Sequence, residues 1–132
     1  MIVYCDTSAL TKLVVAEPES RSLRSWLRRQ SGVSLVVNVL GSVELQRVAA
    51  RVGPDAYRTA ILLLARLDLL ELGPTTLTIA ATLPPPTVRT IDALHVASAA
   101  ELPDLDVLVT YDDRMAEAAR GYGLDVASPG RT

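Results

Sequence analysis

The sequence contains no phenylalanine, a single cysteine and only 4% aromatic residues. Because hydrophobic residues still make up 49% of the chain, a core must be built from aliphatic side chains. With Cys5 as the sole cysteine, an internal disulfide is excluded. Such a chain is typical of a reducing compartment, so we expect a cytoplasmic protein.

Long hydrophobic runs are also absent. The longest uninterrupted run covers residues 60–65, far short of the roughly 20 residues that a membrane-spanning helix needs. The first residues lack a basic leader, and the apolar run 2–5 stops at Asp6, so no signal peptide is expected. A length of 132 residues corresponds to about one domain. We therefore expect a single domain over residues 1–132, without a membrane segment.

Lysine is nearly missing, since Lys12 is the only lysine among 13 basic residues and the rest are arginines. The net charge of −2 and the pI near 5.3 argue at first against a nucleic-acid partner. Setting aside the four acidic residues discussed below, however, leaves 11 of 15 acids against 13 bases. Arginine also contacts phosphate through paired hydrogen bonds. The charge therefore does not exclude a nucleic acid.

Short apolar runs alternate with helical patterns along the chain. We expect strands at residues 2–5, 33–37, 69–72, 107–109 and 124–127. We expect helices at residues 9–15, 19–29, 40–51, 55–67, 76–82, 91–101 and 114–121. This alternation is typical of an α/β fold whose parallel sheet is covered by helices on both faces. In such folds, ligands bind beyond the carboxyl ends of the strands.

Local signals predict several details of these helices. Thr7 or Ser8 can cap the first helix, and Thr90 can cap the helix at residues 91–101. Pro18 is expected to open the second helix. In the helix at residues 40–51, the apolar side chains are expected to face largely inward: Leu40, Val43, Leu45 and Val48.

Four acidic residues fall near one end of the predicted sheet. Asp6 directly follows the first strand, and Asp112 comes three residues after the strand at 107–109. Glu44 lies on the helix after the second strand, and Asp92 lies at the start of a helix. Two carboxylates about 4 Å apart repel by roughly 4 kcal/mol at an effective dielectric constant near 20. A group of them therefore raises its members' pKa values or binds a cation. Oxygen ligands favour Mg²⁺ or Mn²⁺, ions that activate water and neutralise a phosphodiester.

Each acidic residue also has a plainer interpretation. Asp6 and Asp112 suit helix caps, Asp92 suits the positive end of a helix dipole, and Glu44 suits a solvated helix face. Asp113 is a rival to Asp112 that spacing alone does not remove. The shared placement of four acids at one end of the sheet favours a common site. His95, three residues after Asp92, could be a ligand or a base, but a packing role is the commoner one for histidine in an apolar helix.

Four segments, taken in order, resemble the PIN-domain ribonucleases and, among them, the VapC toxins of bacterial toxin–antitoxin pairs. They are residues 4–10 (YCDTSAL), 42–45 (SVEL), 89–97 (RTIDALHVA) and 109–115 (VTYDDRM). The resemblance extends over essentially the whole chain. It implies a sheet order of about 3-2-1-4-5 and an endoribonuclease that depends on Mg²⁺, with Mn²⁺ possible as the ion.

The resemblance also implies roles for individual residues. Asp6, Asp92 and Asp112 would hold the ion directly or through water, and Glu44 would hold a second ion or position the attacking water. The Thr-x-Asp motif at residues 110–112 favours Asp112 over Asp113. Activated water would attack the phosphodiester and leave 5′-phosphate and 3′-hydroxyl ends. The hydroxyl groups of Ser8 and Thr110 would orient this site or its waters. Asn38 stands where relatives often have Ser or Thr, and this departure could alter the hydrogen bonds around the site.

Partners follow from the same resemblance, which implies an RNA substrate, a homodimer and a VapB-type antitoxin whose tail covers the active site. The apolar helix around residues 62–67 suits pairing with a second copy. A basic stripe formed by Arg21, Arg24 and Arg28 could guide RNA or contact an acidic partner, although a solvated helix face is the commoner explanation.

Two other classes of protein fit the fold less well. A receiver-like signalling module has a similar length and sheet, but it needs a lysine late in the chain, and Lys12 is the only lysine. A PIN-like module that binds RNA or a partner without cleavage is the other alternative. The presence of all four acidic residues argues against a loss of catalysis.

Overall fold

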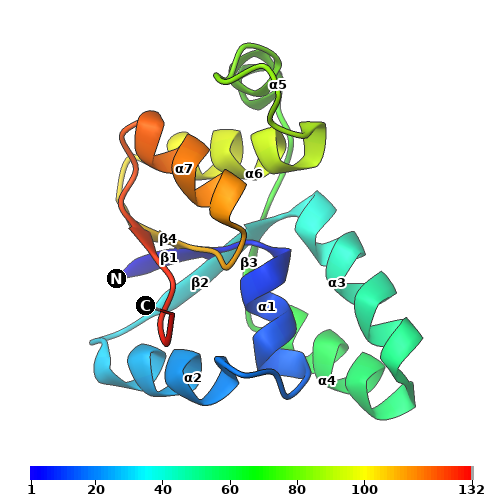
Figure 1. The fold of residues 1–132 in the computed structure, drawn as a ribbon. Coiled ribbons are helices and arrows are strands. Elements are labelled where there is room, and N and C mark those ends of the chain that lie inside the picture. The colour runs from blue at the N-terminus through cyan, green and yellow to red at the C-terminus, as the bar shows by residue number, and fades with distance from the viewer. Residues whose placement is uncertain (132) are drawn as a thin grey trace.

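The protein is built around one parallel five-stranded sheet (Figure 1). A computed structural model describes residues 1–131. The strands follow the order β3-β2-β1-β4-β5, and every neighbouring pair is parallel. Their bounds are β1 Ile2–Cys5, β2 Ser34–Asn38, β3 Asp68–Leu70, β4 Leu105–Val109 and β5 Val126–Ala127. The predicted α/β class and the order 3-2-1-4-5 are confirmed.

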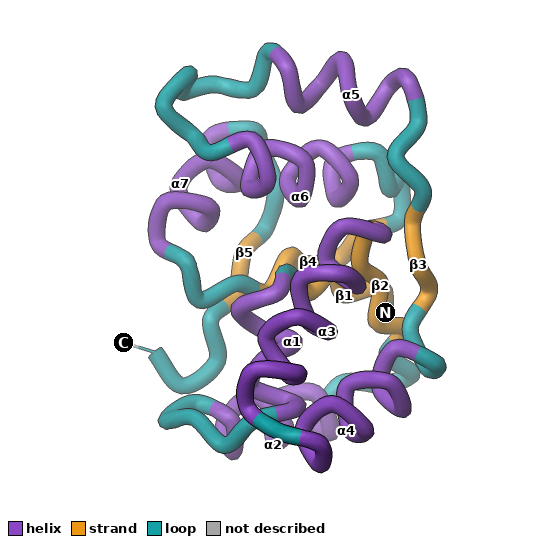
Figure 2. Tube along the Cα trace, turned by 90° about the vertical axis from the view of Figure 1, so that its right-hand side faces the viewer, coloured by secondary structure: helices purple, strands orange, loops and turns teal. Residues whose placement is uncertain are grey.

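Seven helices surround the sheet in residues 1–131 (Figures 1 and 2). Helices α6 and α7 lie along one face of the sheet, and α5 packs on the outer side of α6. Helices α1, α2 and α4 lie on the other side, while α3 leaves the end of β2 and packs on α1 and α4. Their bounds are α1 Thr7–Val14, α2 Ser20–Arg29, α3 Val39–Val52, α4 Pro54–Leu64, α5 Pro74–Ala81, α6 Thr90–Ala100 and α7 Asp113–Gly121.

Every predicted helix and strand is present, but four local predictions are wrong. Pro18 does not open α2, which begins at Ser20 with Glu19 as its cap. Helix α1 is capped by Asp6, whose side chain accepts the Ala9 amide, and not by Thr7 or Ser8. Thr90 is the first residue of α6 and not its cap. Val43 is 53% exposed instead of facing inward. At α1 and α6 the backbone becomes helical at least one residue earlier than the predicted caps require, so local capping propensity does not set these helix starts.

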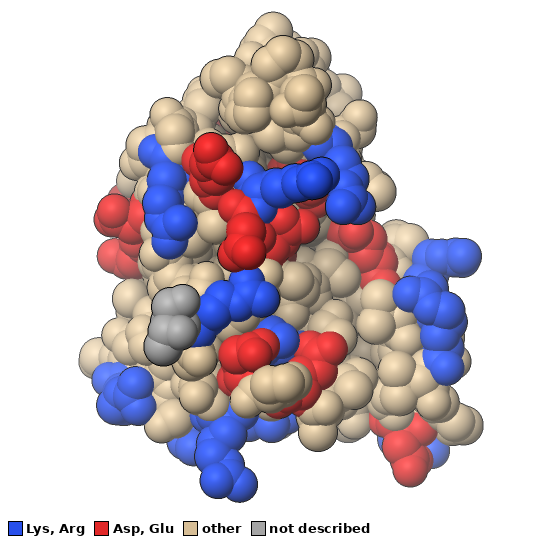
Figure 3. Space-filling model, viewed as in Figure 1, with Lys and Arg blue, Asp and Glu red and all other residues tan. Residues whose placement is uncertain are grey.

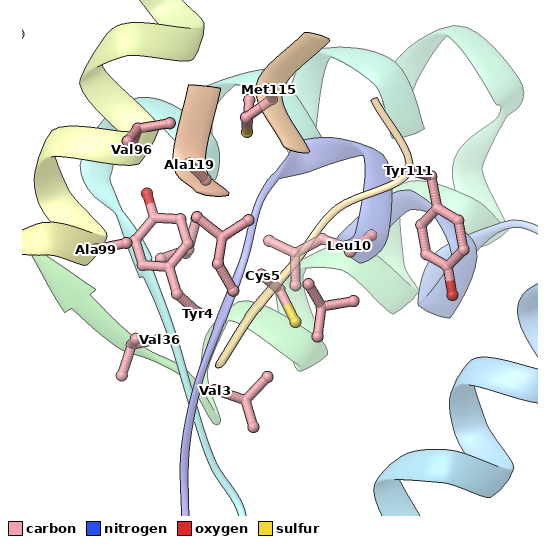
Figure 4. Packing of buried hydrophobic residues seen from close by; sticks show 14 of the residues in the cluster. Val3, Tyr4, Cys5, Leu10, Val36, Val96, Ala99, Tyr111, Met115 and Ala119 are labelled. Carbon is pink, nitrogen blue, oxygen red and sulfur yellow. The ribbon is translucent and has the colours of Figure 1, made fainter. Parts of the chain in front are cut away.

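The core is aliphatic, as the composition predicted (Figure 4). Val3, Tyr4 and Cys5 of β1 are fully buried between the two helical layers. Burial raises the pKa of the Cys5 thiol well above its ordinary value, so this side chain is an inert packing group. Because β1 is the central strand and is covered on both sides, its carboxyl end lies within the packed core.

Crossing a bilayer requires a helix that is both long and apolar. None of the helices in residues 1–131 meets that requirement.

Candidate active site at the carboxyl end of the sheet

Asp6 lies at the centre of the site, directly after β1. Its side chain is almost completely buried, with a relative exposure of 2%. Three donors satisfy it: the Ser8 hydroxyl at 2.7 Å and the Ala9 amide at 3.0 Å on Oδ1, and the Thr110 hydroxyl at 2.6 Å on Oδ2. Burial raises the pKa of Asp6 and outweighs the opposing effect of these hydrogen bonds. Asp6 is therefore a helix cap and also a buried carboxylate whose ionised form is disfavoured by its surroundings.

Asp112 combines two roles in a similar way. Its Oδ1 accepts the backbone amides of Arg114 and Met115, so it caps α7. Its Oδ2 accepts no hydrogen bond within residues 1–131. Asp113, the rival candidate, points to solvent with a side-chain exposure of 93% and pairs with Arg131. The geometry thus brings Asp112, and not Asp113, to the other acidic residues.

Asp92 lies in the first turn of α6 and faces the same space. Its carboxylate has no hydrogen-bond partner in the described chain. Burial raises the pKa of Asp92, and repulsion from Asp112 adds to that effect. A nearby arginine, Arg89, acts in the opposite direction. The carboxylate is thus left with unused acceptor capacity beside other negative charges.

Glu44 reaches the site from α3 and is not the solvated side chain that its sequence position allowed. Its Oε1 accepts the Thr7 hydroxyl at 2.7 Å and faces Nε2 of His95 at 2.8 Å. Burial tends to raise the pKa of Glu44, but the hydrogen bonds from His95 and Thr7 hold it below its usual value. Glu44 is therefore a stably ionised member of the site.

The four carboxylates line one cleft of about 210 Å³. Figure 3 shows acidic side chains gathered near the middle of this face, with basic side chains on either side of them. Arg89 is the basic residue in the lining of the cleft. A larger neighbouring groove, lined by Val43, Arg47 and Arg51, shares the Glu44 side of this cleft. The cleft lies where an α/β sheet is expected to bind its ligand.

The donor set of this cleft suits a hard divalent cation, because most of it is carboxylate and hydroxyl oxygens and Nε2 of His95 already faces Glu44. Within residues 1–131, no three acidic, histidine or cysteine side chains are close enough to enclose an ion as they stand. Magnesium typically uses one or two carboxylates and retains several waters. The free oxygens of Asp92 and Asp112 meet that smaller requirement, so the residues present fit such an ion.

Two of the three predicted orienting residues contact the acids directly. Ser8 and Thr110 each donate to Asp6, and the backbone amides of Tyr111 and Asp112 in turn reach these hydroxyls. Asn38 contacts none of the four acids. Its side chain caps α3 by accepting the Gly41 amide at 2.8 Å, and donates to the Ser98 hydroxyl and the Leu94 carbonyl. It therefore supports the scaffold of α3 and α6 beside the site.

Sequence reasoning gave little weight to His95, which is buried as a packing residue would be but also contacts Glu44. Its spacing of three residues from Asp92 was the available signal. The partner of its other ring nitrogen, Tyr4, lies 91 residues away and carries no local signal.

The sequence and the fold are both similar to those of known proteins. The PIN domain family model matches residues 3–121. Ribonuclease VapC47 from Mycobacterium tuberculosis is 45% identical over 133 aligned residues, covering 98% of each chain. The crystal structure of Mycobacterium tuberculosis VapC20, a sarcin-ricin loop cleaving toxin, has a TM-score of 0.75 at 12% identity, covering 96% of this chain and 99% of that one. A chain of VapBC2 from Rickettsia felis, bound to a promoter DNA fragment, has a TM-score of 0.74 at 15% identity, covering 96% of this chain and 98% of that one.

Proposed function

This chain belongs to the PIN-domain family, in its VapC branch, and from that premise we propose that it is a metal-dependent endoribonuclease acting as the toxin of a toxin–antitoxin pair. The observation that carries the proposal is the convergence of Asp6, Glu44, Asp92 and Asp112 on one cleft. A protein has little structural reason to crowd four acids into one partly buried space, because their repulsion destabilises the fold. A catalytic ion explains the arrangement.

We propose Mg²⁺ as that ion, with Mn²⁺ as an alternative. When bound, it would neutralise phosphate charge and lower the pKa of water. Asp92 and Asp112 would hold it, since their free oxygens face the cleft without hydrogen-bond partners in residues 1–131. Asp6 would contribute through a carboxylate that Ser8 and Thr110 fix in one orientation.

Glu44 has a different role in this proposal. Its Oε1 is occupied by Thr7 and His95, so Oε2 is the oxygen available for the reaction. Oε2 would accept a hydrogen bond from the attacking water and orient it toward the phosphorus atom. In-line attack would break the bond to the leaving 3′ oxygen and give 5′-phosphate and 3′-hydroxyl ends. Substrate binding would use Arg89, the basic residue of the cleft lining, to contact a phosphate.

The proposed partners have support of their own. Ile61 and Leu62 on α4 are 41% and 63% exposed, which suits the predicted pairing with a second copy. A complex such as VapBC2 supports a cognate antitoxin for this chain. Negative charge in the cleft would attract an arginine in the antitoxin tail. With cellular RNA as its substrate, the proposed protein would act in the cytoplasm.

The test is cleavage of total bacterial RNA by the purified chain with Mg²⁺, with Mn²⁺ and with EDTA. Variants Asp6→Asn and Asp92→Asn are expected to lose at least about 100-fold in rate, because each removes a charge from the cleft without changing the side-chain shape. Asp104→Asn, an exposed acid before β4, serves as the matched control. Full Mg²⁺-dependent cleavage by both cleft variants would show that the proposed function is wrong.

A further inference from the structure

A buried chain of hydrogen bonds connects the backbone at the end of β2 to Glu44. The Asn38 amide donates to the Tyr4 hydroxyl at 3.2 Å, and that hydroxyl lies 2.7 Å from Nδ1 of His95. Nε2 of His95 lies 2.8 Å from Oε1 of Glu44. Tyr4 and His95 are 0% and 1% exposed, so water does not compete with the contact between them. The Glu44 side chain, at the end of the series, is 30% exposed.

The direction of each hydrogen bond follows from the chemistry of its groups. A backbone amide can only donate, so the Tyr4 oxygen accepts from Asn38. A carboxylate can only accept, so Nε2 of His95 must carry the proton that faces Glu44. In a neutral imidazole Nδ1 is then an acceptor, and it accepts a hydrogen bond from the Tyr4 hydroxyl. For the neutral ring, the two hydrogen bonds of His95 define one tautomer, with the proton on Nε2.

Packing fixes the ring in that orientation as well. The Tyr4 and His95 rings meet edge to face, with centroids 5.8 Å apart and planes at 75°. Figure 4 shows the Tyr4 ring lying against α6, beside Ala99. On the other side, a β-carbon at Gly41 would come within 3.0 Å of Cε1 of His95 and would collide with the Val37 side chain. The absence of a side chain at Gly41 therefore leaves space for the imidazole against α3.

From these contacts we infer that Tyr4 and His95 are positioning residues that hold Glu44 in its working orientation. They act with Thr7, because both donors bind Oε1 and leave Oε2 without a partner in residues 1–131. This inference rests on the proposed function, since it assigns Glu44 the task of orienting the attacking water. Groups that orient a metal-site carboxylate typically change metal affinity or activity by about 10- to 100-fold when they are removed.

The experiment compares three substitutions in the full-length chain. Tyr4→Phe removes the hydroxyl that sets the tautomer, and His95→Ala removes the donor to Glu44. His95→Gln restores an N–H group that can reach Glu44, but not the aromatic ring. Thr76→Val is the matched control, because Thr76 lies in α5, away from the cleft, and its buried hydroxyl bonds Glu101.

The first measurement is Mn²⁺ binding by titration calorimetry, together with kcat and KM for RNA cleavage. Tyr4→Phe and His95→Ala are expected to lower kcat about 10-fold, more than they raise KM. Mn²⁺ binding should change less than kcat, because Asp6, Asp92 and Asp112 hold the proposed ion and Glu44 orients the attacking water. His95→Gln is expected to recover most of the loss relative to His95→Ala. A purely structural role predicts a different result, in which all three variants behave like Thr76→Val.

The second measurement reads the tautomer directly. The chain has one histidine, so its imidazole nitrogen signals in an NMR spectrum need no assignment. The wild-type protein is expected to show the proton on Nε2, and diamagnetic Mg²⁺ is expected to shift that signal. In Tyr4→Phe the preference for this tautomer should weaken, while in Thr76→Val it should persist.

The outcomes distinguish a failure of the proposed function from a failure of the positioning role of Tyr4 and His95. A wild-type chain that neither binds Mn²⁺ nor cleaves RNA would overturn the proposed function and this inference with it. A wild-type chain that does both, while Tyr4→Phe and His95→Ala match Thr76→Val, would overturn the inference alone. A proton found on Nδ1 in the wild-type protein would also overturn it. If Tyr4→Phe does not fold, the comparison of His95→Gln with His95→Ala still decides.

Discussion

The Thr110 hydroxyl donates a 2.6 Å hydrogen bond to Oδ2 of Asp6, across a separation of 104 residues. The two residues follow Val109 and Cys5, which are paired neighbours in the parallel register of β4 and β1. Their contact is thus a direct result of the crossover that places β4 beside the central strand. The Ser8 hydroxyl completes the arrangement by donating to Oδ1 at 2.7 Å. A buried carboxylate is in this way held by hydroxyls from two separate segments.

Replacing Thr110 with valine tests this relationship. Valine keeps the shape but removes the donor to Asp6 and the acceptor of the Asp112 amide. We expect RNA cleavage to fall about 10- to 100-fold and stability to fall by about 1–3 kcal/mol, since two buried polar groups lose a partner. The measurements are cleavage rate and urea-induced unfolding. Thr110→Ser keeps the hydroxyl and should stay close to wild type in rate; an equal loss in both variants would refute the role of the hydroxyl.

A second prediction separates the neighbouring acids Asp112 and Asp113. Asparagine is a good helix cap, so Asp112→Asn should keep α7 intact while removing charge from the cleft. We expect at least about a 100-fold loss of cleavage with little change in the circular dichroism spectrum. Asp113→Asn should retain nearly full activity, because the Asp113 side chain is exposed and pairs with Arg131 on the surface. A larger loss of cleavage in Asp113→Asn than in Asp112→Asn would assign the metal-binding role to Asp113 instead.

The fold was predictable from the sequence because its signals are local and repeated. Runs such as residues 2–5 and 107–109 are short, apolar and separated by helices, which leaves a parallel sheet as the consistent arrangement. Helix ends were less predictable. The choice between Asp6 and Thr7 as the cap of α1 depends on how the chain leaves β1, and this is a tertiary property. The alternatives of cap and site for Asp6 and Asp112 were also not exclusive, since one carboxylate has enough lone pairs for both.

The environment of Glu44 could not be predicted in the same way. Its partners Thr7 and His95 lie 37 and 51 residues away, on other helices. Tyr4 appears in the sequence as one apolar residue of a buried strand, and nothing nearby indicates that its hydroxyl meets a histidine. Val43, beside Glu44, is exposed although the apolar pattern of its helix predicted an inward side chain. Long-range side-chain pairing therefore sets the details that spacing alone leaves open.

A third prediction concerns Asp92 and the cost of the site to stability. Burial and then repulsion from Asp112 raise the pKa of Asp92 above its unfolded value. The native state therefore binds the Asp92 proton more tightly than the unfolded state does. As pH rises from the ordinary aspartate range through the raised pKa, the free energy of unfolding falls. At neutral pH Asp92 is ionised in both states, and the whole destabilisation by its buried charge is present. Asp92→Asn should then raise Tm by a few degrees in EDTA, while abolishing cleavage.

Thermal unfolding at about pH 7 and about pH 4 tests the predicted direction of this pH dependence. The gain from Asp92→Asn should be larger near pH 7, because part of the wild-type Asp92 is already protonated near pH 4. Asp104→Asn controls for general changes in net charge, since Asp104 is exposed. A Tm that falls in Asp92→Asn near neutral pH would contradict the assignment of Asp92 as a strained charge.

A fourth prediction concerns the ion. A ligand that binds only the native state raises the free energy of unfolding by about 2.7 kcal/mol at about 100 times its dissociation constant. Saturating Mn²⁺ should therefore raise the Tm of the wild-type chain, and EDTA should reverse the effect. In Asp6→Asn and Asp92→Asn the increase should be mostly lost. An equal increase in wild type and variants would mean that the ion binds elsewhere.

The last prediction concerns Gly41, in the first turn of α3. In an exposed helix, replacing glycine with alanine usually stabilises by about 0.5–1 kcal/mol. At Gly41 the sign should reverse, because the new β-carbon would collide with Val37 and press on Cε1 of His95. We expect Gly41→Ala to lose about 1–3 kcal/mol of stability, as overpacked cores do, and to lower the cleavage rate through displacement of His95 from Glu44.

Gly121, at the end of α7, provides the matched control for this substitution. A β-carbon added at Gly121 would meet no atom within 4 Å apart from its chain neighbours and the backbone of its own helix. Gly121→Ala should therefore leave activity unchanged and stability equal or slightly higher. Urea unfolding of the two variants side by side measures the difference, and equal stabilisation by both would show that the packing of His95 against α3 is looser than the structure indicates.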